Sequence, residues 1–119
     1  MATPKIMPQT APQDVRVHIG CDAAGKITVE PDPFWIYRCE DEQVKWVCVQ
    51  HHEHGDANDP CFKVDFDKTT GSPFNDSHFE GHRRALSGRP TSKAKDNQRY
   101  KYSVTVGKQT LDPDGGVKP

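Results

Sequence analysis

The chain has 119 residues, of which 33% are hydrophobic and 28% are charged, and its formal net charge is -1. A chain of this length supports one domain around one hydrophobic core. No segment is apolar for long enough to span a membrane. The near-zero net charge excludes a globally basic protein of the kind that coats nucleic acid. With so few apolar residues, the core has to be built from alternating side chains rather than long apolar runs.

The first 13 residues differ in composition from the rest of the chain. They contain Pro4, Pro8 and Pro12 and lack the continuous apolar stretch of a secretory signal. We therefore expect a flexible tail over 1–13, one domain over 14–119 and a cytoplasmic protein. Four cysteines would allow two disulfides in a secreted domain, but without a signal we expect reduced thiols.

Two short alternating segments open the domain, at 14–20 and 26–30. The residues between them include Asp and Gly, which favour turns, so the pair is predicted to form a β-hairpin. Pro31 and Pro33 follow and remove two backbone donors. We therefore expect the next strand, 34–38, to lie at a sheet edge or to change sheets.

The next strand carries apolar side chains on both faces. Val44, Trp46 and Cys48 share one face, and Val47 and Val49 share the other. This pattern is typical of a strand with neighbours on both sides, and it predicts a central strand with Trp46 in the core.

Strict alternation returns at 61–67 and at 100–106, where Tyr100 and Tyr102 share the apolar face. The 32 residues of 68–99 show no clear strand and are predicted to form one long loop. We expect Phe74 and Phe79 to anchor this loop.

Within the long loop, Asn75 or Asp76 is expected to cap a short helix that Gly88 ends. The chain then turns at Gly107 and returns through 111–117. Together the segments predict an all-β sandwich of about seven strands with one long loop.

The order of these segments resembles the cupredoxin family of Greek-key β-sandwiches, which carry electrons with copper. The residues that carry the resemblance are Ile27-Thr-Val29 with Pro31 and Pro33, Val44-Lys-Trp46, Phe62-Lys-Val64-Asp-Phe66, Ser72-Pro73-Phe74 and Tyr100-Lys-Tyr102. The resemblance covers about 15–117 and implies a Greek-key sandwich.

The copper ligands of that family are missing from this sequence. Cys61 and Phe62 stand near the position of the first histidine, Val104 stands near that of the cysteine, and no His, Cys or Met follows His82. Soft and imidazole ligands are required for a blue-copper site. The resemblance therefore implies a copper-free domain that serves as a binding or accessory module.

One segment, 48–61, is rich in potential metal ligands. Imidazole and thiolate are preferred ligands of zinc, copper and nickel. The paired spacing of structural zinc sites is absent, however, and Cys48 shares the phase of Trp46. Two interpretations remain open: a solvated loop without a cofactor, or a metal site formed by His51, His52, His54 and Cys61.

A second segment, 83–101, carries seven cationic residues and one acid, a net charge of +6. It is either a solvated loop or a surface that binds an acidic protein partner. The candidate partner-binding residues are Arg83, Arg84, Arg89, Lys93 and Lys95. Nucleic acid is disfavoured because the whole chain is slightly acidic and no aromatic residue that could stack on bases precedes Tyr100.

No catalytic signature is present. Asp65 and Asp67 share an outward strand face that is exposed to water. They are therefore not expected to lie in an apolar pocket of the kind that activates a catalytic carboxylate. Ser72 and Ser87 lack the sequence frame of a nucleophile elbow. The sequence thus predicts a binding module that is not an enzyme, with a metal-binding protein as the alternative.

Overall fold

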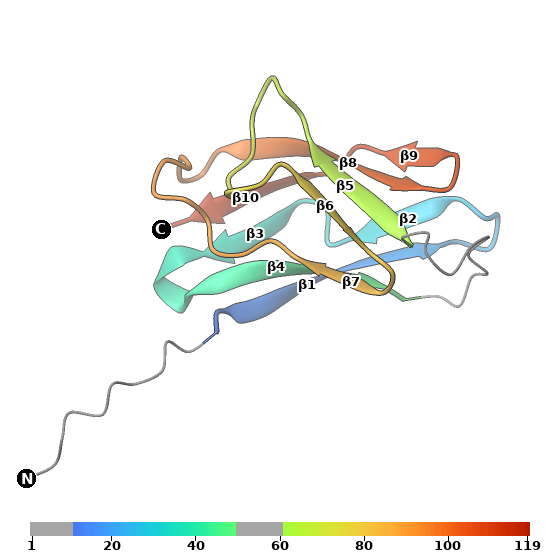
Figure 1. Cartoon of the computed structure of the whole chain (residues 1–119), viewed down its shortest axis with the longest axis horizontal. Helices are drawn as coiled ribbons and strands as arrows, with labels where there is room; N and C mark the ends of the chain where they lie inside the picture. Colours follow the sequence, from blue (N-terminus) through green and yellow to red (C-terminus); the bar gives the residue numbers. More distant parts are fainter. Residues whose placement is uncertain (1–10, 50–60) are drawn as a thin grey trace, which may run out of the picture.

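The structure is a computed structural model, and it describes residues 11–49 and 61–119. In these ranges the chain forms ten strands in two sheets (Figure 1), with a single turn of 3-10 helix at Arg38–Glu40. The all-β class is confirmed, whereas about seven strands is too few. None of the described residues belongs to a helix long and apolar enough to cross a membrane.

The first sheet has the strand order β2-β1-β4-β7. β1 and β2 form the predicted antiparallel hairpin, and β1 pairs in parallel with β4. β4 lies between β1 and β7, so its prediction as a central strand is confirmed. The bounds are β1 Gln13–Cys21, β2 Ile27–Glu30, β4 Glu42–Cys48 and β7 Arg84–Leu86.

The second sheet has the order β3-β10-β8-β5-β6, and β9 also pairs with β8. Pro31 and Pro33 lie between β2 of the first sheet and β3 at the edge of the second, so the predicted change of sheet is confirmed. The bounds are β3 Phe34–Tyr37, β5 Phe62–Phe66, β6 His78–Gly81, β8 Arg99–Val106, β9 Gln109–Leu111 and β10 Asp114–Lys118.

The two sheets pack face to face around an aromatic core made of Phe34, Trp46, Phe66, Phe74, Phe79 and Tyr102. Trp46 is 0% exposed, and its ring centroid lies 5.2–6.4 Å from the other five. Trp46 belongs to the first sheet, and its ring partners come from the second sheet and the segment before β6. The rings therefore join the layers in a sandwich-like arrangement.

The segment 68–99 is not one loop, and the predicted short helix is wrong. β6 pairs with β5 and β7 pairs with β4, so the chain crosses from one sheet to the other between them. Glycine is required at position 81 in this crossing, because the Cβ of any other residue would overlap the carbonyl oxygen of Arg84. Phe74 and Phe79 are buried, as predicted for anchors.

Two core polar atoms, Trp46 Nε1 and the Tyr102 hydroxyl, are buried without a hydrogen-bond partner in the described part of the chain. Burial raises the pKa of Tyr102 well above that of an exposed phenol, and the nearby indole N–H only partly offsets this. Tyr100 differs, because its hydroxyl accepts a hydrogen bond of 2.9 Å from the Lys95 amide.

These two tyrosines provide a matched test of the core. Tyr102→Phe should leave the free energy of unfolding unchanged or raise it slightly, because it removes a polar atom that has no partner. Tyr100→Phe should lower it by about 1 kcal/mol, because the Lys95 amide loses its acceptor. Urea denaturation measures both. A larger loss for Tyr102→Phe than for Tyr100→Phe would contradict this description of the core.

Candidate binding surface

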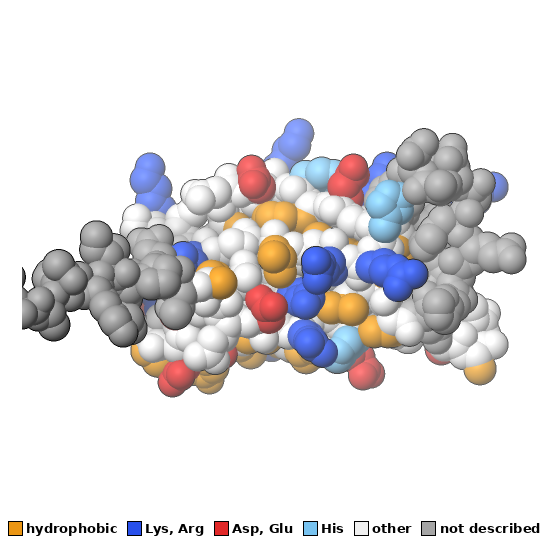
Figure 2. All heavy atoms as spheres, turned by 60° about the horizontal axis from the view of Figure 1, so that its bottom comes forward, with side chains coloured by type: hydrophobic (Ala, Val, Ile, Leu, Met, Phe, Trp, Pro, Cys, Tyr) orange, Lys and Arg blue, Asp and Glu red, His pale blue; other side chains and the backbone are white. Residues whose placement is uncertain are grey.

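The outward side chains of the first sheet form two neighbouring rows. Arg16 pairs with Lys45 and Lys45 with Leu86, while His18 pairs with Val47 and Val47 with Arg84. These alternate with the buried positions of the same strands, so they point to solvent. We call these six residues the cationic face. Figure 2 shows Lys and Arg side chains beside hydrophobic ones on the side of the molecule turned forward there.

Most of the positive charge on the cationic face is not neutralised. Lys45 Nζ lies 3.8 Å from a carboxylate oxygen of Asp14. Among the described residues, no ion pair involves Arg16 or Arg84. Leu86 of edge strand β7 is 49% exposed, next to Lys45 across the sheet and two residues from Arg84 along β7. The face therefore combines unpaired guanidinium groups with exposed apolar surface.

A shallow hollow of about 640 Å³ adjoins one side of the cationic face. It opens where β2 ends, beside Arg16 and His18 of β1. Its remaining lining residues are Val29, Glu30, Pro31 and Asp32. Because the lining mixes cationic and acidic side chains, the hollow does not by itself select a ligand of one charge.

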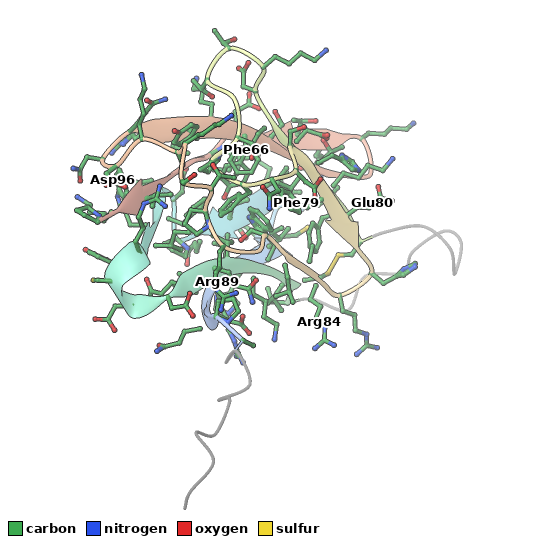
Figure 3. All side chains as sticks on the ribbon, turned by 60° about the vertical axis from the view of Figure 1, so that its left-hand side comes forward. Phe66, Phe79, Glu80, Arg84, Arg89 and Asp96 are labelled. Carbon is green, nitrogen blue, oxygen red and sulfur yellow. A yellow bond between two sulfur atoms is a disulfide. The ribbon has the colours of Figure 1, made fainter. Side chains whose placement is uncertain are left out.

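Of the five predicted partner-binding residues, Arg84 lies on the cationic face and Arg83 directly precedes it. Arg89 instead forms a bidentate ion pair with Asp41, with Nε–Oδ1 and Nη2–Oδ2 distances of 2.7 and 3.0 Å. These hydrogen bonds lower the pKa of Asp41. In Figure 3, Arg84 and Arg89 are labelled at separate places. The charge of Arg89 is thus largely satisfied within the molecule.

Lys93 and Lys95 lie in a segment that Arg38 holds in place. The guanidinium group of Arg38 donates to the carbonyl oxygens of Thr91 and Ala94, at 2.9 and 2.7 Å, and to Asp96 at 2.8 Å. The structure therefore does not bring the five predicted residues together. The cationic face was missed because it depends on which strands are neighbours, which no local pattern specifies.

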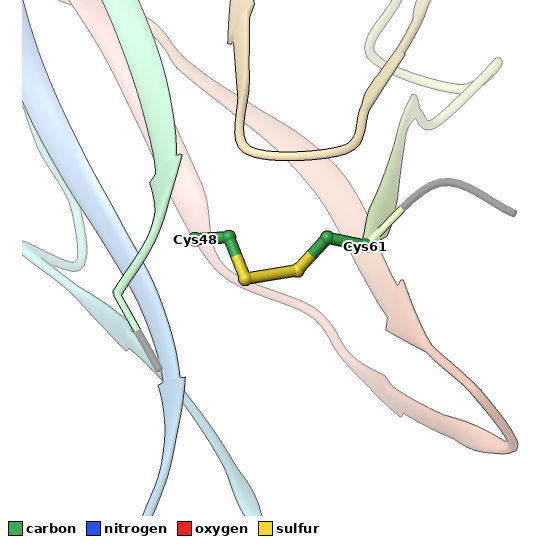
Figure 4. The surroundings of a disulfide bond; sticks show 2 residues. All are labelled: Cys48 and Cys61. Atoms are coloured by element: carbon green, nitrogen blue, oxygen red, sulfur yellow. A yellow bond between two sulfur atoms is a disulfide. The ribbon is translucent and has the colours of Figure 1, made fainter. Parts of the chain in front are cut away.

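A disulfide joins Cys48 at the end of β4 to Cys61 just before β5, and so links the two sheets (Figure 4). The expectation of reduced thiols is therefore wrong for this pair. The reduced state of these cysteines no longer supports the expectation of a cytoplasmic protein. A disulfide sulfur cannot serve as a thiolate ligand, so Cys61 does not fill its predicted metal-binding role in this form.

The three histidines of the predicted metal site, His51, His52 and His54, lie outside the described residues. In 11–49 and 61–119, no group of three His, Cys, Asp or Glu side chains is placed to hold a metal ion. A zinc, copper or nickel site on the histidines stays a prediction, now without the thiolate of Cys61.

The disulfide closes a sequence separation of 13 residues. Cys48→Ala combined with Cys61→Ala should lower the free energy of unfolding by about 3 kcal/mol, because the unfolded chain regains the entropy of the open loop. A reductant should lower the urea midpoint of the native protein and leave the double variant unchanged. Cys39→Ala, at an exposed thiol, is the control. No effect of reductant on the native protein would count against the bond.

A separate charged cluster lies on the outer face of the second sheet. His78 of β6 bridges two carboxylates, with Nδ1 2.5 Å from Asp65 and Nε2 3.0 Å from Glu80. The hydrogen bond to Asp65 and then that to Glu80 raise the pKa of His78. Both ring nitrogens are occupied, so the cluster holds a proton and has no free nitrogen for a metal ion.

The raised pKa makes stability depend on pH. The protonated ring is favoured in the folded state, so its contribution is fully present below the ordinary histidine pKa of 6.5 and is lost as pH rises through the higher folded value. Below pH 6.5, His78→Gln should lower the free energy of unfolding by at most about 1 kcal/mol, which is the usual contribution of an exposed ion pair. In alkaline solution the loss should be smaller. Thermal denaturation across pH measures this difference. An equal loss at both ends would contradict it.

No protein-family model matches this chain, and neither a curated protein nor a solved structure is similar enough to count as a match. Function is therefore inferred from the surfaces themselves. The charges of Arg38, Arg89 and His78 are satisfied by neighbouring acids. Within the described ranges, Arg16 and Arg84 have no ion pair and share one sheet face with exposed Leu86, which makes the cationic face the strongest candidate for binding.

Proposed function

We propose that this protein is a copper-free, cupredoxin-like Greek-key sandwich that serves as a non-catalytic binding module for an acidic protein partner. The observation that carries the proposal is the cationic face, where Arg16 and Arg84 have no ion pair among the described residues and exposed Leu86 lies next to Lys45 and Arg84. Arginine and apolar side chains at the centre of a patch are typical of protein interfaces. A carboxylate of the partner would bind a guanidinium group in a bidentate fashion.

A protein partner is favoured over nucleic acid by the other side chains around this face. Asp14 lies on the same outer side beside Lys45, and Glu30 pairs with His18 across β1 and β2. Both carboxylates would repel a nucleic-acid backbone, which carries a charge at every phosphate, whereas a protein partner can place its few carboxylates opposite the cations alone. The cationic face itself carries Val47 and Leu86 and has no Phe, Tyr or Trp ring on which a base could stack.

The copper-free part of the proposal is supported by Val104. This residue stands near the position of the family's cysteine ligand, and it is 0% exposed in β8. A buried valine fills that part of the core with methyl groups that bind no metal. The two-sheet order and the sheet change at Pro31 and Pro33 support the Greek-key part.

A labelled peptide of alternating Glu and Val residues is a suitable probe, with fluorescence anisotropy as the measurement. Lys45→Thr combined with Arg84→Thr should weaken binding at least about tenfold, because it removes two cations and keeps a β-favouring residue at each position. Lys63→Thr combined with Lys108→Thr removes the same charge elsewhere and should leave the affinity unchanged. Binding by the native protein should weaken as salt rises.

Three outcomes would overturn this function. The first is no binding of the peptide by the native protein, and the second is equal weakening by both double variants. The third is tighter binding of a single-stranded DNA oligonucleotide than of the peptide, with the same dependence on Lys45 and Arg84.

A further inference from the structure

Among the residues that the structure describes, one stretch of β1 has a neighbouring strand on one side only. In the parallel pairing with β4, Gln13 N donates to Asp41 O at 2.8 Å, and Ile19 O accepts from Val49 N at 3.0 Å. Odd-numbered residues of β1 therefore face β4, and alternate residues face the opposite side. At Asp14 and Arg16 this opposite side is the outer edge of the sheet.

β2 pairs with this edge of β1 only from His18 onward. The β1–β2 pairing runs from His18 opposite Glu30 to Cys21 opposite Ile27. The hollow lined by Arg16, Glu30 and Pro31 opens where β2 would otherwise continue. No described strand pairs with this edge at Asp14 or Arg16. Such an edge is a template for another strand.

The open stretch is complementary to itself. We propose that a second copy of this chain pairs with it, β1 against β1, antiparallel and centred on Val15. In this register Asp14 of each copy lies opposite Arg16 of the other, and their free N–H and C=O groups face each other. The opposite charges lie on the same face and attract. The half-buried Val15 side chains meet at the two-fold axis on the inner side.

The pairing is bounded on both sides and is therefore short. Pro12 lacks an N–H, and His18 is already paired with Glu30, so the contact is limited to about 13–17. A contact of this length is smaller than a standard stable interface, and we expect a weak dimer at high protein concentration. Opposite charges at 14 and 16 favour a second copy over an acidic strand, which Asp14 would repel.

The dimer would join two first sheets into one. A two-fold axis perpendicular to the sheet keeps both cationic faces on the same side, so Lys45 and Arg84 of both copies would line one surface. The dimer shares Arg16 with the cationic face, but it forms without a partner and can therefore be tested separately from the proposed function.

A pair of charge reversals tests the dimer by sedimentation equilibrium. The native protein should show a mass that rises with concentration from 13.4 kDa toward twice that value. Asp14→Arg and Arg16→Asp each place like charges opposite each other, so each variant alone should associate roughly tenfold more weakly. An equimolar mixture of the two should associate again, because every 14–16 pair between the variants is then of opposite charge.

Lys108→Asp changes the charge as Arg16→Asp does, in an exposed turn, and should leave the native association unchanged. A native protein that stays at 13.4 kDa up to millimolar concentration would overturn the proposal. So would association that survives both reversals, or a mixture that associates no better than either variant alone.

A cross-link tests the register independently of charge. In the proposed register, the two copies of residue 15 face each other as a pair without direct hydrogen bonds. The Cα atoms of such a pair are about 4.5 Å apart, within reach of a disulfide. Val15→Cys combined with Cys39→Ser should form a covalent dimer under mild oxidation, and Thr28→Cys in the same background should not. Equal cross-linking at both positions, or none at 15, would contradict the register.

Discussion

The fold depends on Trp46. Its indole is 0% exposed and contacts rings from the second sheet and from the segment before β6. Burying this much aromatic surface is the largest single apolar contribution that a chain with 33% hydrophobic residues offers. Its Nε1 has no hydrogen-bond partner among the described residues, so packing holds the side chain in place there.

The placement of Trp46 also determines the outer surface. Side chains alternate along a strand, so once Val44 and Trp46 point inward, Lys45 and Val47 must point outward. The same rule turns Arg16 outward beside buried Val17. Neighbouring strands bring these outward residues together, and the disulfide from Cys48 ties the end of β4 to the second sheet. The cationic face is thus a consequence of the core.

Local sequence patterns correctly predicted the features that depend on alternating side chains and on turn residues. The hairpin at Asp22 and Gly25, the sheet change at Pro31 and the central strand around Trp46 are all correct. The helix expected in 68–99 is wrong because β6 and β7 are stabilised by pairing with β5 and β4, which lie far away in sequence.

For the same reason the run of charges in 83–101 did not predict which cations lie together on the surface. It counted Arg89, which Asp41 neutralises, and omitted Arg16 and Lys45, which β-pairing places on the same sheet face as Arg84 and Leu86. Likewise, the Cys48–Cys61 bond follows from the meeting of two strand ends in space.

We propose that the outer side of the first sheet, and not the segment held by Arg38, binds an acidic partner. Amide chemical shifts of isotope-labelled protein, followed during titration with the peptide of alternating Glu and Val, test this claim most directly. We expect shifts at Arg16, Lys45 and Arg84 and at their strand neighbours. Shifts confined to 91–98, or to the second sheet around His78, would contradict it.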